Sequence, residues 1–357
     1  MPQKAIPYLF MRGGTSRGPF FNRADLPQDL DELAEILIEV IGAGHPLNID
    51  GIGGGTAVTT KVAMLSPSDD DWAEVDYFFA QVSVEDRLVD YKPTCGNMLT
   101  AVGPAALEMG LIEPKGDETE IRIRAVNTGA EVVAQVQTPG GGVEYQGETK
   151  VDGIPGHAAP VRLNFHKVAG SATGALLPTG NLRDEIDGIK VTCMDVAMPV
   201  VMARADAFGL TGYETREELD ANRDFFARME AVRLKAGEGM GMGDVSKSVT
   251  PKFTILAPAR DGGSIAARYF MPWQTHPTLA VTGAQCIAAC ALAPGSVADG
   301  LWTRPNANPV DMKLEHPSGV IDVAIDFQNG PDGFQVRSAG LTRTARKIAS
   351  GQVFVGI

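Results

Sequence analysis

The chain has 357 residues, of which 44% are hydrophobic and 21% are charged, with 31 Lys and Arg against 44 Asp and Glu. The net charge of −13 argues against a nucleic-acid partner or an acidic membrane, which both require a basic face, but it does not exclude a small anionic substrate. No apolar run approaches the roughly 20 residues that span a bilayer, and the start, Met1 to Lys4, lacks the plan of a signal peptide, so we expect a cytoplasmic protein.

Four segments show the alternation of apolar and polar residues that is typical of half-buried, antiparallel strands. They are residues 8–11, 75–82, 120–126 and 131–136. The Pro and Gly residues of segment 139–142 then predict a hairpin turn.

Four further segments predict helices: residues 30–41, 98–111, 216–236 and 283–292. The first and third carry charged faces and are expected on the outside of the protein. The second and fourth are apolar nearly all round, so we expect each to be buried and wrapped by its own sheet. Pro104 has no N–H for a helical hydrogen bond and should kink the second helix.

These elements lack the regular strand–helix rhythm of a doubly wound sheet. They predict an α+β chain of two similar halves, each a curved, mostly antiparallel sheet around a central buried helix. The length favours two domains, which we place at residues 1–180 and 181–357, with the chain end free to cross back to the first. No sequence repeat proves that the halves are related.

Cys95 is the cysteine whose surroundings suggest chemistry. It lies between segments 93–94 (Pro-Thr) and 96–97 (Gly-Asn), where the buried helix is expected to begin. The unpaired N–H groups and positive end of a helix lower the pKa of a thiol and bind anions. Free cysteines are otherwise small buried hydrophobes, which is how we interpret Cys286 and Cys290. The four cysteines include no CxxC pair and predict no disulfide framework.

A glycine-rich loop at residues 51–55 precedes Lys61. A P-loop has Gly directly before its Lys and Ser or Thr directly after, whereas Thr60 and Val62 flank this one, and the dinucleotide fingerprint fails at Thr56. We therefore expect no nucleotide. The loop leaves a backbone that an anion can approach, followed by a lysine in an apolar context. An exposed lysine on a strand edge is the alternative.

A second flexible loop, residues 11–18, combines a guanidinium, two hydroxyls and three glycines. Arg12 could bind a carboxylate through two parallel hydrogen bonds, while Thr15, Ser16 and glycine amides hold a second oxygen. An ordinary turn with solvated arginines is the alternative interpretation.

Four motifs, taken in order, resemble the methylaconitate isomerase family, which includes the 4-oxalomesaconate tautomerases and shares the diaminopimelate epimerase fold. They are Met11-Arg12-Gly13-Gly14-Thr15-Ser16-Arg17-Gly18, Ile49-Asp50-Gly51-Ile52-Gly53-Gly54 leading to Thr60-Lys61-Val62-Ala63, Cys95-Gly96-Asn97, and His316-Pro317-Ser318-Gly319. The similarity runs nearly end to end, through residues 343–347, and length and loop content are closer to the 4-oxalomesaconate branch. The resemblance implies two similar halves, with the active site in the cleft facing the N-termini of both buried helices.

In the epimerases of this fold, two cysteines face each other, one at each helix start. Cys95 matches the first, but Thr282 stands where the second thiol would be, so we do not expect a two-thiol racemase. The resemblance implies that Lys61 replaces the second acid or base. A lysine that is desolvated has a lowered pKa and acts as a neutral amine. It would titrate together with a nearby thiol, and which of the two removes the proton stays open.

The resemblance also implies which residues bind the substrate. In the first half these are Arg12, Gly13, Thr15, Ser16, Gly53, Gly54, Thr60, Gly96 and Asn97, and in the second half His276, Thr282, Gly283 and Ser318. His276 is equally well interpreted as a structural histidine. The five histidines show no metal-binding spacing, and we expect neither a metal nor a cofactor.

The chain is thus expected to be a cofactor-independent isomerase or tautomerase that moves a proton in an unsaturated di- or tricarboxylate. We take 4-oxalomesaconate as the leading substrate and 2-methylaconitate or aconitate as the alternative. A carboxylate-binding protein without turnover is a second alternative. Such a binder needs anion clamps but not a thiol beside an amine, which favours an enzyme. A homodimer is compatible with the sequence.

Overall fold

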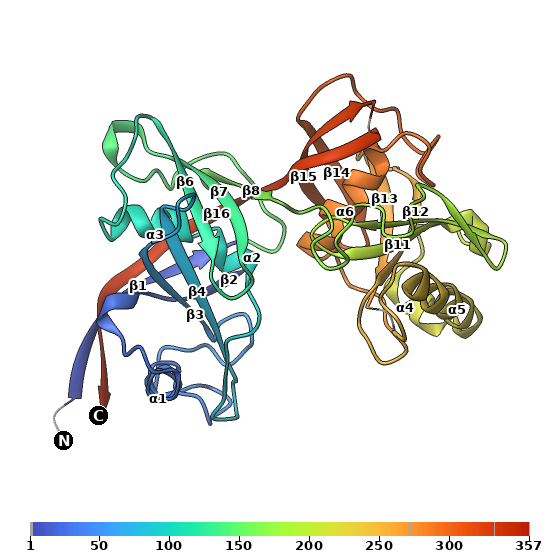
Figure 1. Cartoon of the computed structure of the whole chain (residues 1–357). Coiled ribbons are helices and arrows are strands. Elements are labelled where there is room, and N and C mark those ends of the chain that lie inside the picture. The colour runs from blue at the N-terminus through green and yellow to red at the C-terminus, as the bar shows by residue number, and fades with distance from the viewer. Residues whose placement is uncertain (1–2, 272, 332, 357) are drawn as a thin grey trace. The chain divides into compact units, whose positions relative to one another are not determined.

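The computed structural model describes residues 3–271, 273–331 and 333–356; Met1 and Pro2, which belong to the start that lacks a signal-peptide plan, lie outside them. The chain divides into two compact units (Figure 1), unit 1 being Met1–Phe165 with Thr342–Ile357 and unit 2 His166–Leu341. The division falls after Phe165 and not at residue 180, and the chain end returns to unit 1. Within the described ranges, no helix is long and apolar enough to cross a membrane.

Unit 1 is built on a mixed sheet. Its strands are β1 (Gln3–Gly13), β2 (Ser16–Asn22), β3 (Lys61–Pro67), β4 (Val75–Val82), β5 (Val89–Asp90), β6 (Glu118–Ala125), β7 (Ala130–Gln137) and β8 (Pro160–His166), and its helices are η1 (Arg23–Asp25), α1 (Leu30–Ile41), α2 (Gly96–Leu99), α3 (Val102–Glu108) and η2 (Pro139–Gly141). The strand order is β1-β2-β3-β4-β6-β7-β8, with β5 beside β4. The β2–β3 and β4–β6 pairs are parallel, and the other described pairs of these strands are antiparallel.

Alternate side chains of this sheet face two different helix layers. Phe20 and Ala63 pack with α2 and α3, whereas their neighbours Phe21 and Met64 pack with α1. Strands β1 to β4 and β6 to β8 contribute to the α2–α3 core, so the sheet wraps around these helices as the pattern predicts. Asp29 caps the first turn of α1, which explains why that helix begins where the sequence predicts.

The helix expected at residues 98–111 is broken in two. α2 ends at Leu99 and α3 begins at Val102. Pro104 lies in the first turn of α3, where the absence of its N–H is tolerated, and the break occurs over the preceding residues. The helix is therefore interrupted as predicted, but the break lies at Thr100 and Ala101 and not at the proline.

The hairpin predicted at segment 139–142 is wrong. The tight antiparallel pair is β6–β7, and segment 139–141 forms the 3-10 helix η2 after β7. β7 does pair with β8 in antiparallel fashion, but β8 begins only at Pro160. Glycine and proline mark a turn correctly here but do not specify which strands it joins.

Unit 2 has the same kind of architecture. Its strands are β9 (Asp184–Ile186), β10 (Ile189–Asp195), β11 (Pro199–Arg204), β12 (Lys252–Pro258), β13 (Ile265–Phe270), β14 (Val310–His316) and β15 (Gly319–Gly330), and its helices are η3 (Ala205–Phe208), α4 (Arg216–Ala221), α5 (Arg223–Gly239) and α6 (Val281–Leu292). The long strand β16 (Gly333–Gly356) pairs with β15 over its first residues and with β1 over its last.

Helices also occupy both faces of the unit 2 sheet. α4 and α5 pack on β10, β11, β12 and β13 and keep one charged face in solvent, whereas α6 lies among β11, β14 and β15 and is buried from Gly283 onward (Figure 1). The helix expected at 216–236 is interrupted at Asn222, whose side chain caps α5. The expected architecture of a sheet around one central buried helix is thus present in each unit.

Candidate functional site

Lys61 is the first residue of β3 and is held by its strand neighbour. Its Nζ atom donates to Oε1 of Gln81 at 2.6 Å, and Gln81 lies directly opposite Lys61 in the β3–β4 pair. The same Nζ atom lies 5.3 Å from the centroid of the Phe79 ring. Among the described residues, no carboxylate lies within ion-pair distance of this amine, so its immediate partners are neutral.

Thr60 supports this arrangement from inside the protein. Its side chain is fully buried, and its hydroxyl donates to the carbonyl of Val82 at 2.7 Å. The Gln81 amide donates to the Thr60 hydroxyl at 3.1 Å. Thr60 therefore positions Gln81, which in turn positions Lys61, and its hydroxyl has no exposed surface for a ligand.

The side chains of β4 that contact Lys61 lie on the same face of the strand as Tyr77, which contacts Cys95. Side chains at alternate positions of a strand share a face, so Tyr77, Phe79 and Gln81 point the same way. The Tyr77 hydroxyl donates to the Cys95 carbonyl at 3.3 Å, and the rings of Tyr77 and Phe79 lie 6.3 Å apart. Burial, followed by the nearby Cys95, raises the pKa of Tyr77 well above its ordinary value, so this donor keeps its proton.

Cys95 itself is the residue before α2. It is half-buried and unpaired, and it makes no side-chain cap to the helix. α2 has only four residues, so the dipole at Cys95 is that of a single turn and not of the long helix that the sequence suggested. The thiol nonetheless lies against the core that Tyr77 and Phe79 build.

Asn97 joins the first and third motifs. Its Oδ1 accepts from the Thr15 amide at 3.4 Å, and its Nδ2 donates to the Thr15 hydroxyl at 3.1 Å. Gly14 has φ of +49°, and a Cβ there would lie 2.1 Å from Asn97 Oδ1, so only glycine allows this approach. The β1–β2 turn is therefore fastened to the start of α2.

Arg12 is engaged with the backbone. Its Nη1 donates to the carbonyls of Gly14 at 2.9 Å and Thr344 at 2.8 Å, which ties the β1–β2 turn to β16. Burial lowers the pKa of Arg12, and the nearby Arg346 adds to this effect. A guanidinium carries five N–H donors, so Arg12 holds the turn and retains other donors for a carboxylate.

The glycine-rich loop follows α1 and packs on it. The Gly53 amide donates to the Ile41 carbonyl at 3.1 Å, and a Cβ at Gly53 would lie 2.6 Å from that oxygen. The loop also meets the β1–β2 turn, because the Arg17 amide donates to the Val58 carbonyl at 3.0 Å. Close packing accounts for Gly53, while Gly54 is exposed.

Unit 1 thus gathers its predicted residues around one hairpin turn. Gly13 and Ser16 pair across the start of that turn, and Ser16 is only 3% exposed. Thr15 is exposed, and Gly96 is half-buried with open space beside its Cα. A ligand can therefore reach Arg12, Thr15, Gly54, Gly96 and Asn97, which are half-buried or exposed.

In unit 2, His276 lies beside the ring of Tyr269. Its amide donates to the Tyr269 carbonyl at 2.8 Å, and the two ring centroids are 5.9 Å apart. His276 Nδ1 accepts from the Thr278 amide at 3.0 Å. Burial lowers the pKa of His276, and the cations Lys252 and Arg216 lower it further against the opposing bond from Thr278. The ring is therefore a neutral imidazole with its proton on Nε2 near pH 7.

Ser318 and the first turn of α6 complete the unit 2 residues. The Ser318 hydroxyl donates to the Pro277 carbonyl at 2.7 Å, which ties the β14–β15 turn to the segment of His276. Thr282 is half-buried in the first turn of α6, and Gly283 is buried against Tyr269. The Ser318–Pro277 bond and the contacts of Tyr269 with His276 and Gly283 thus bring the β14–β15 turn, His276 and the α6 start together.

The remaining cysteines belong to the core, as expected for Cys286 and Cys290. Cys193, Cys286 and Cys290 are fully buried, and burial raises the pKa of each thiol. Within the described part of the chain, no group of three His, Cys, Asp or Glu residues could hold a metal ion.

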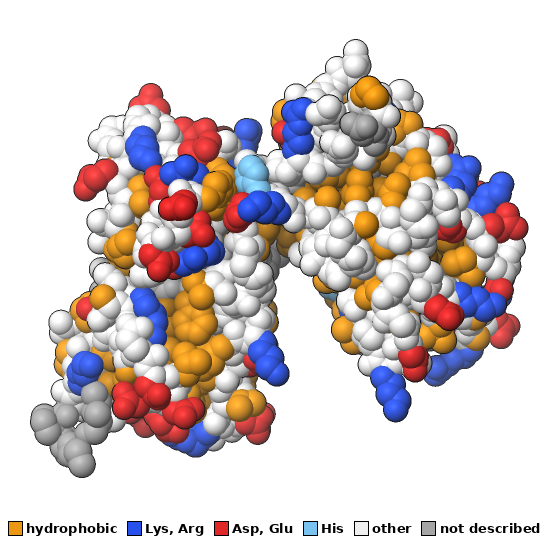
Figure 2. Space-filling model, in the orientation of Figure 1, with side chains coloured by type: hydrophobic (Ala, Val, Ile, Leu, Met, Phe, Trp, Pro, Cys, Tyr) orange, Lys and Arg blue, Asp and Glu red, His pale blue; other side chains and the backbone are white. Residues whose placement is uncertain are grey.

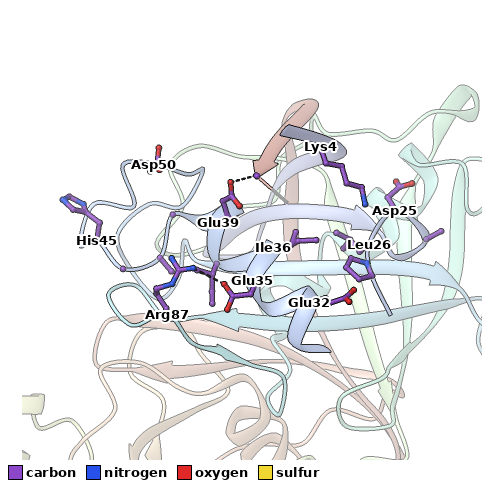
Figure 3. A pocket seen from close by; sticks show the side chains of 17 residues that line it. Lys4, Asp25, Leu26, Glu32, Glu35, Ile36, Glu39, His45, Asp50 and Arg87 are labelled. Atoms are coloured by element: carbon purple, nitrogen blue, oxygen red, sulfur yellow. Dashed lines mark hydrogen bonds and ion pairs between the residues drawn. The ribbon is translucent and has the colours of Figure 1, made fainter. Parts of the chain in front are cut away.

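A pocket of about 1080 Å³ lies elsewhere on unit 1, beside α1 (Figure 3). Carboxylates dominate its lining and include Asp25, Glu32, Glu35, Glu39 and Asp50. None of the predicted site residues lines it, and its charge is unsuited to an anionic substrate. On the face of unit 1 that Figure 2 shows, acidic side chains otherwise lie interspersed with Lys and Arg.

Two residues that contact Lys61 and Cys95 in unit 1 were not predicted as site residues from the sequence. Gln81 and Tyr77 were assigned only to a half-buried strand. Tyr77, Phe79 and Gln81 alternate along β4, and this spacing could have placed all three on one face. Their contacts with Lys61 and Cys95 could not be predicted, because these depend on strand pairing and on the path of the loop after β5.

A comparison with protein families matches residues 3–356 of the chain to the family described as "PrpF protein". The 4-oxalomesaconate tautomerase of Pseudomonas putida is 45% identical over 100% of this chain and 98% of its own length. The (4E)-oxalomesaconate Delta-isomerase of a Novosphingobium species is 44% identical over 98% of each chain.

Solved structures agree with this assignment. A methylitaconate-delta-isomerase superposes with a TM-score of 0.92 at 31% identity, over 99% of this chain and 96% of its own. A hydroxyproline epimerase from Agrobacterium vitis has a TM-score of 0.50 at 15% identity, over 99% of this chain and 92% of its own, which supports the racemase and epimerase fold alone. The expected α+β, diaminopimelate epimerase-like fold is confirmed, and the chain belongs to the PrpF family.

Proposed function

We propose that this protein is a cofactor-independent isomerase that moves a proton in an unsaturated di- or tricarboxylate, with 4-oxalomesaconate as its leading substrate. The relatives named for oxalomesaconate are 44% and 45% identical to this chain, whereas the methylitaconate-delta-isomerase is 31% identical. The higher identity favours the oxalomesaconate reaction over the isomerisation of methylitaconate.

The environment of Lys61 carries the proposal. A general base must be available without its proton, and a carboxylate nearby would hold a lysine in its charged form. The described partners of the Lys61 amine are instead the Gln81 carbonyl oxygen and the face of Phe79. Both orient the amine without adding a negative charge.

The reaction needs a base, an acid and hydrogen-bond donors that stabilise the developing negative charge. A base takes a proton from carbon, the negative charge spreads over the conjugated carboxylate system, and a proton returns to another atom. In unit 1, the accessible donors for the developing charge are the Thr15 hydroxyl, the amides of Gly96 and Asn97, and the remaining N–H groups of Arg12. Gly13, Ser16, Gly53 and Thr60 would act by shaping this backbone.

Cys95 is the second proton-transfer group of the proposal. It lies on the same core surface as Phe79, with its backbone held by Tyr77. In unit 2, His276, Thr282, Gly283 and Ser318 would bind further oxygens of the substrate. A simple carboxylate-binding protein does not require a thiol at the α2 start, which favours turnover.

Proton exchange in deuterated buffer tests this function directly. The protein would be incubated separately with 4-oxalomesaconate, 2-methylaconitate and cis- and trans-aconitate, and exchange would be followed by NMR. Exchange and isomerisation of 4-oxalomesaconate are expected. Exchange of 2-methylaconitate alone would move the assignment to that substrate, and binding without exchange of any compound would support a carboxylate-binding protein.

The variants Cys95→Ser and Lys61→Ala divide the two proton-transfer roles. If Lys61 removes the proton, Lys61→Ala abolishes exchange, whereas Cys95→Ser retains exchange and slows product formation. The opposite pattern would make Cys95 the base. Wild-type rates in both variants would exclude proton transfer by this pair.

A further inference from the structure

The two units repeat one pattern of strand pairing. In unit 1, β3 runs parallel to β2 and antiparallel to β4, and β4 runs parallel to β6. In unit 2, β12 runs parallel to β11 and antiparallel to β13, and β13 runs parallel to β14. The buried helix follows β4 in one unit and β13 in the other. This order makes β12 the counterpart of β3.

The two counterpart strands begin with the same residue type. β3 reads KVAMLSP from Lys61 and β12 reads KFTILAP from Lys252, and both are half-buried at the lysine and buried behind it. The register agrees with this alignment. The residue two after Lys61 pairs with Phe79, and the residue two after Lys252 pairs with Tyr269. Lys252 thus occupies the position of Lys61, and Tyr269 that of Phe79.

Strand alternation sets the side on which Lys252 lies. Phe253 and Ile255 belong to the core under α4 and α5, so Lys252 and Thr254 belong to the opposite face of β12, which α6 covers. Lys61 likewise lies on the face of β3 that the helices α2 and α3 cover, because Val62 and Met64 on the other face pack with α1.

In the described part of the chain, no carboxylate lies within ion-pair distance of the Lys252 amine. Burial lowers the pKa of Lys252, and the cation Arg233 lowers it further. The cation that acts on Lys252, Arg233, is itself paired with Glu230. Lys252 in turn lowers the pKa of His276, together with Arg216. A half-buried amine without a carboxylate is a favourable place for an anionic ligand.

Tyr269 connects this lysine to the start of α6. Its side chain is fully buried, and its hydroxyl has no hydrogen-bond partner among the described residues. A Cβ at Gly283, in the first turn of the twelve-residue helix α6, would lie 2.6 Å from the hydroxyl oxygen. An unpaired buried donor is costly, and an anion bound at this turn would give it an acceptor.

We propose that Lys252 supplies the positive charge to the substrate-binding first turn of α6 in unit 2. The inference rests on the proposed function, since it assigns one carboxylate of the substrate to this site. Lys61 is then the proton-transfer lysine and Lys252, its counterpart by strand register, is a substrate-binding lysine.

The test uses the full chain with Lys252→Gln, Lys252→Arg and the control Lys313→Gln, an exposed lysine on β14 of the same unit. Binding of tricarballylate, a saturated tricarboxylate, is measured by calorimetry, and KM and kcat are measured with 4-oxalomesaconate. Lys252→Gln should raise the Kd and KM about tenfold or more with kcat changed less than threefold. Lys252→Arg should restore most of the affinity, and Lys313→Gln should match the wild type.

The other possible results contradict either the role of Lys252, the proposed function, or both. A Lys252→Gln variant that binds tricarballylate as tightly as the wild type, with an unchanged Tm, excludes this role of Lys252. Loss of kcat in both Lys252 variants at constant KM would make Lys252 a proton-transfer residue instead. If wild-type protein binds tricarballylate but isomerises none of the acids, the proposed function fails while the binding result still decides the role of Lys252. Wild-type protein that binds no carboxylate overturns both proposals.

Discussion

The Lys61 Nζ atom lies 2.6 Å from Oε1 of Gln81, its direct neighbour across the β3–β4 pair. The Gln81 amide nitrogen is anchored in turn by the Thr60 hydroxyl and by backbone carbonyls including that of Ala57. Because the amide cannot rotate without breaking these bonds, its oxygen is fixed toward the lysine. A neutral acceptor therefore orients the proposed base.

Removing the amine should stop the chemistry and spare binding. Lys61→Met keeps the stem of the side chain but removes the base, and general acid–base catalysis contributes about 10²–10⁴-fold. We expect isomerisation to fall by that factor while the Kd for tricarballylate changes only a few-fold. The control is Lys4→Met, an exposed lysine of β1. Wild-type turnover in Lys61→Met would show that the base lies elsewhere.

Replacing the neutral acceptor by a carboxylate should shift the pH dependence. In Gln81→Glu, a negative charge beside Lys61 favours the ammonium form of the lysine, which cannot act as a base. The base is then available only at higher pH, so the acid limb of the pH profile of kcat/KM should move upward by about one unit or more. Gln81→Met, which removes the acceptor without adding charge, should lower the rate but leave the limb in place. An unmoved limb in Gln81→Glu would contradict the role of Lys61.

Freeing the β1–β2 turn should weaken substrate binding. Asn97→Ala removes both bonds to Thr15 and should cost about 1 kcal/mol of unfolding free energy, with KM raised several-fold. Thr15→Val removes only the hydroxyl bond, so it should retain the turn but lose the donor to substrate. Urea unfolding and steady-state kinetics measure both effects. If Asn97→Ala leaves stability and KM unchanged, the turn is held by other contacts.

Glu315 makes stability depend on pH. Burial raises its pKa, but hydrogen bonds from the amides of Arg260, Gly263 and Asp261 outweigh this and lower it overall. A lowered pKa in the folded state means that the stabilisation is present above the unfolded value of about 4.3 and is lost as pH falls through the folded value. At pH 7, Glu315→Gln should cost about 2 kcal/mol.

Chemical unfolding at pH 7 and pH 3 measures this dependence. The difference between wild type and Glu315→Gln should shrink at the lower pH, because the wild-type carboxylate is then partly protonated. Glu185→Gln, at an exposed position on β9, should show little difference at either pH. An equal cost for Glu315→Gln at both pH values would mean that shape, and not charge, holds the loop.

Several elements could be predicted because they depend on local chemistry. α1 covers residues 30–41 as expected, since its apolar positions repeat at helical spacing, Asp29 caps its start and Gly42 adopts a left-handed conformation at its end. β4 covers residues 75–82 as expected from the alternation along this segment. The ordered motifs were sufficient to identify the family.

The partners of the site residues could not be predicted, because they depend on which distant segments meet. Arg12 binds the carbonyl of Thr344, near the other end of the chain, and Asn97 binds Thr15. Neither pair has a local sequence signal. The same limit explains the wrong hairpin at segment 139–142, where the turn residues were recognised but the strand pairing was not.

The sequence by itself determined the family, the two-part α+β plan and the residue types available for chemistry, because these follow from local patterns and motif order. Only the tertiary structure decided that Gln81 orients Lys61, that Thr60 acts from the interior, and that Lys252 stands in register with Lys61. Sheet register is set by side-chain packing on both faces at once, and a similarity such as KVAMLSP and KFTILAP gains meaning only when both strands have the same neighbours.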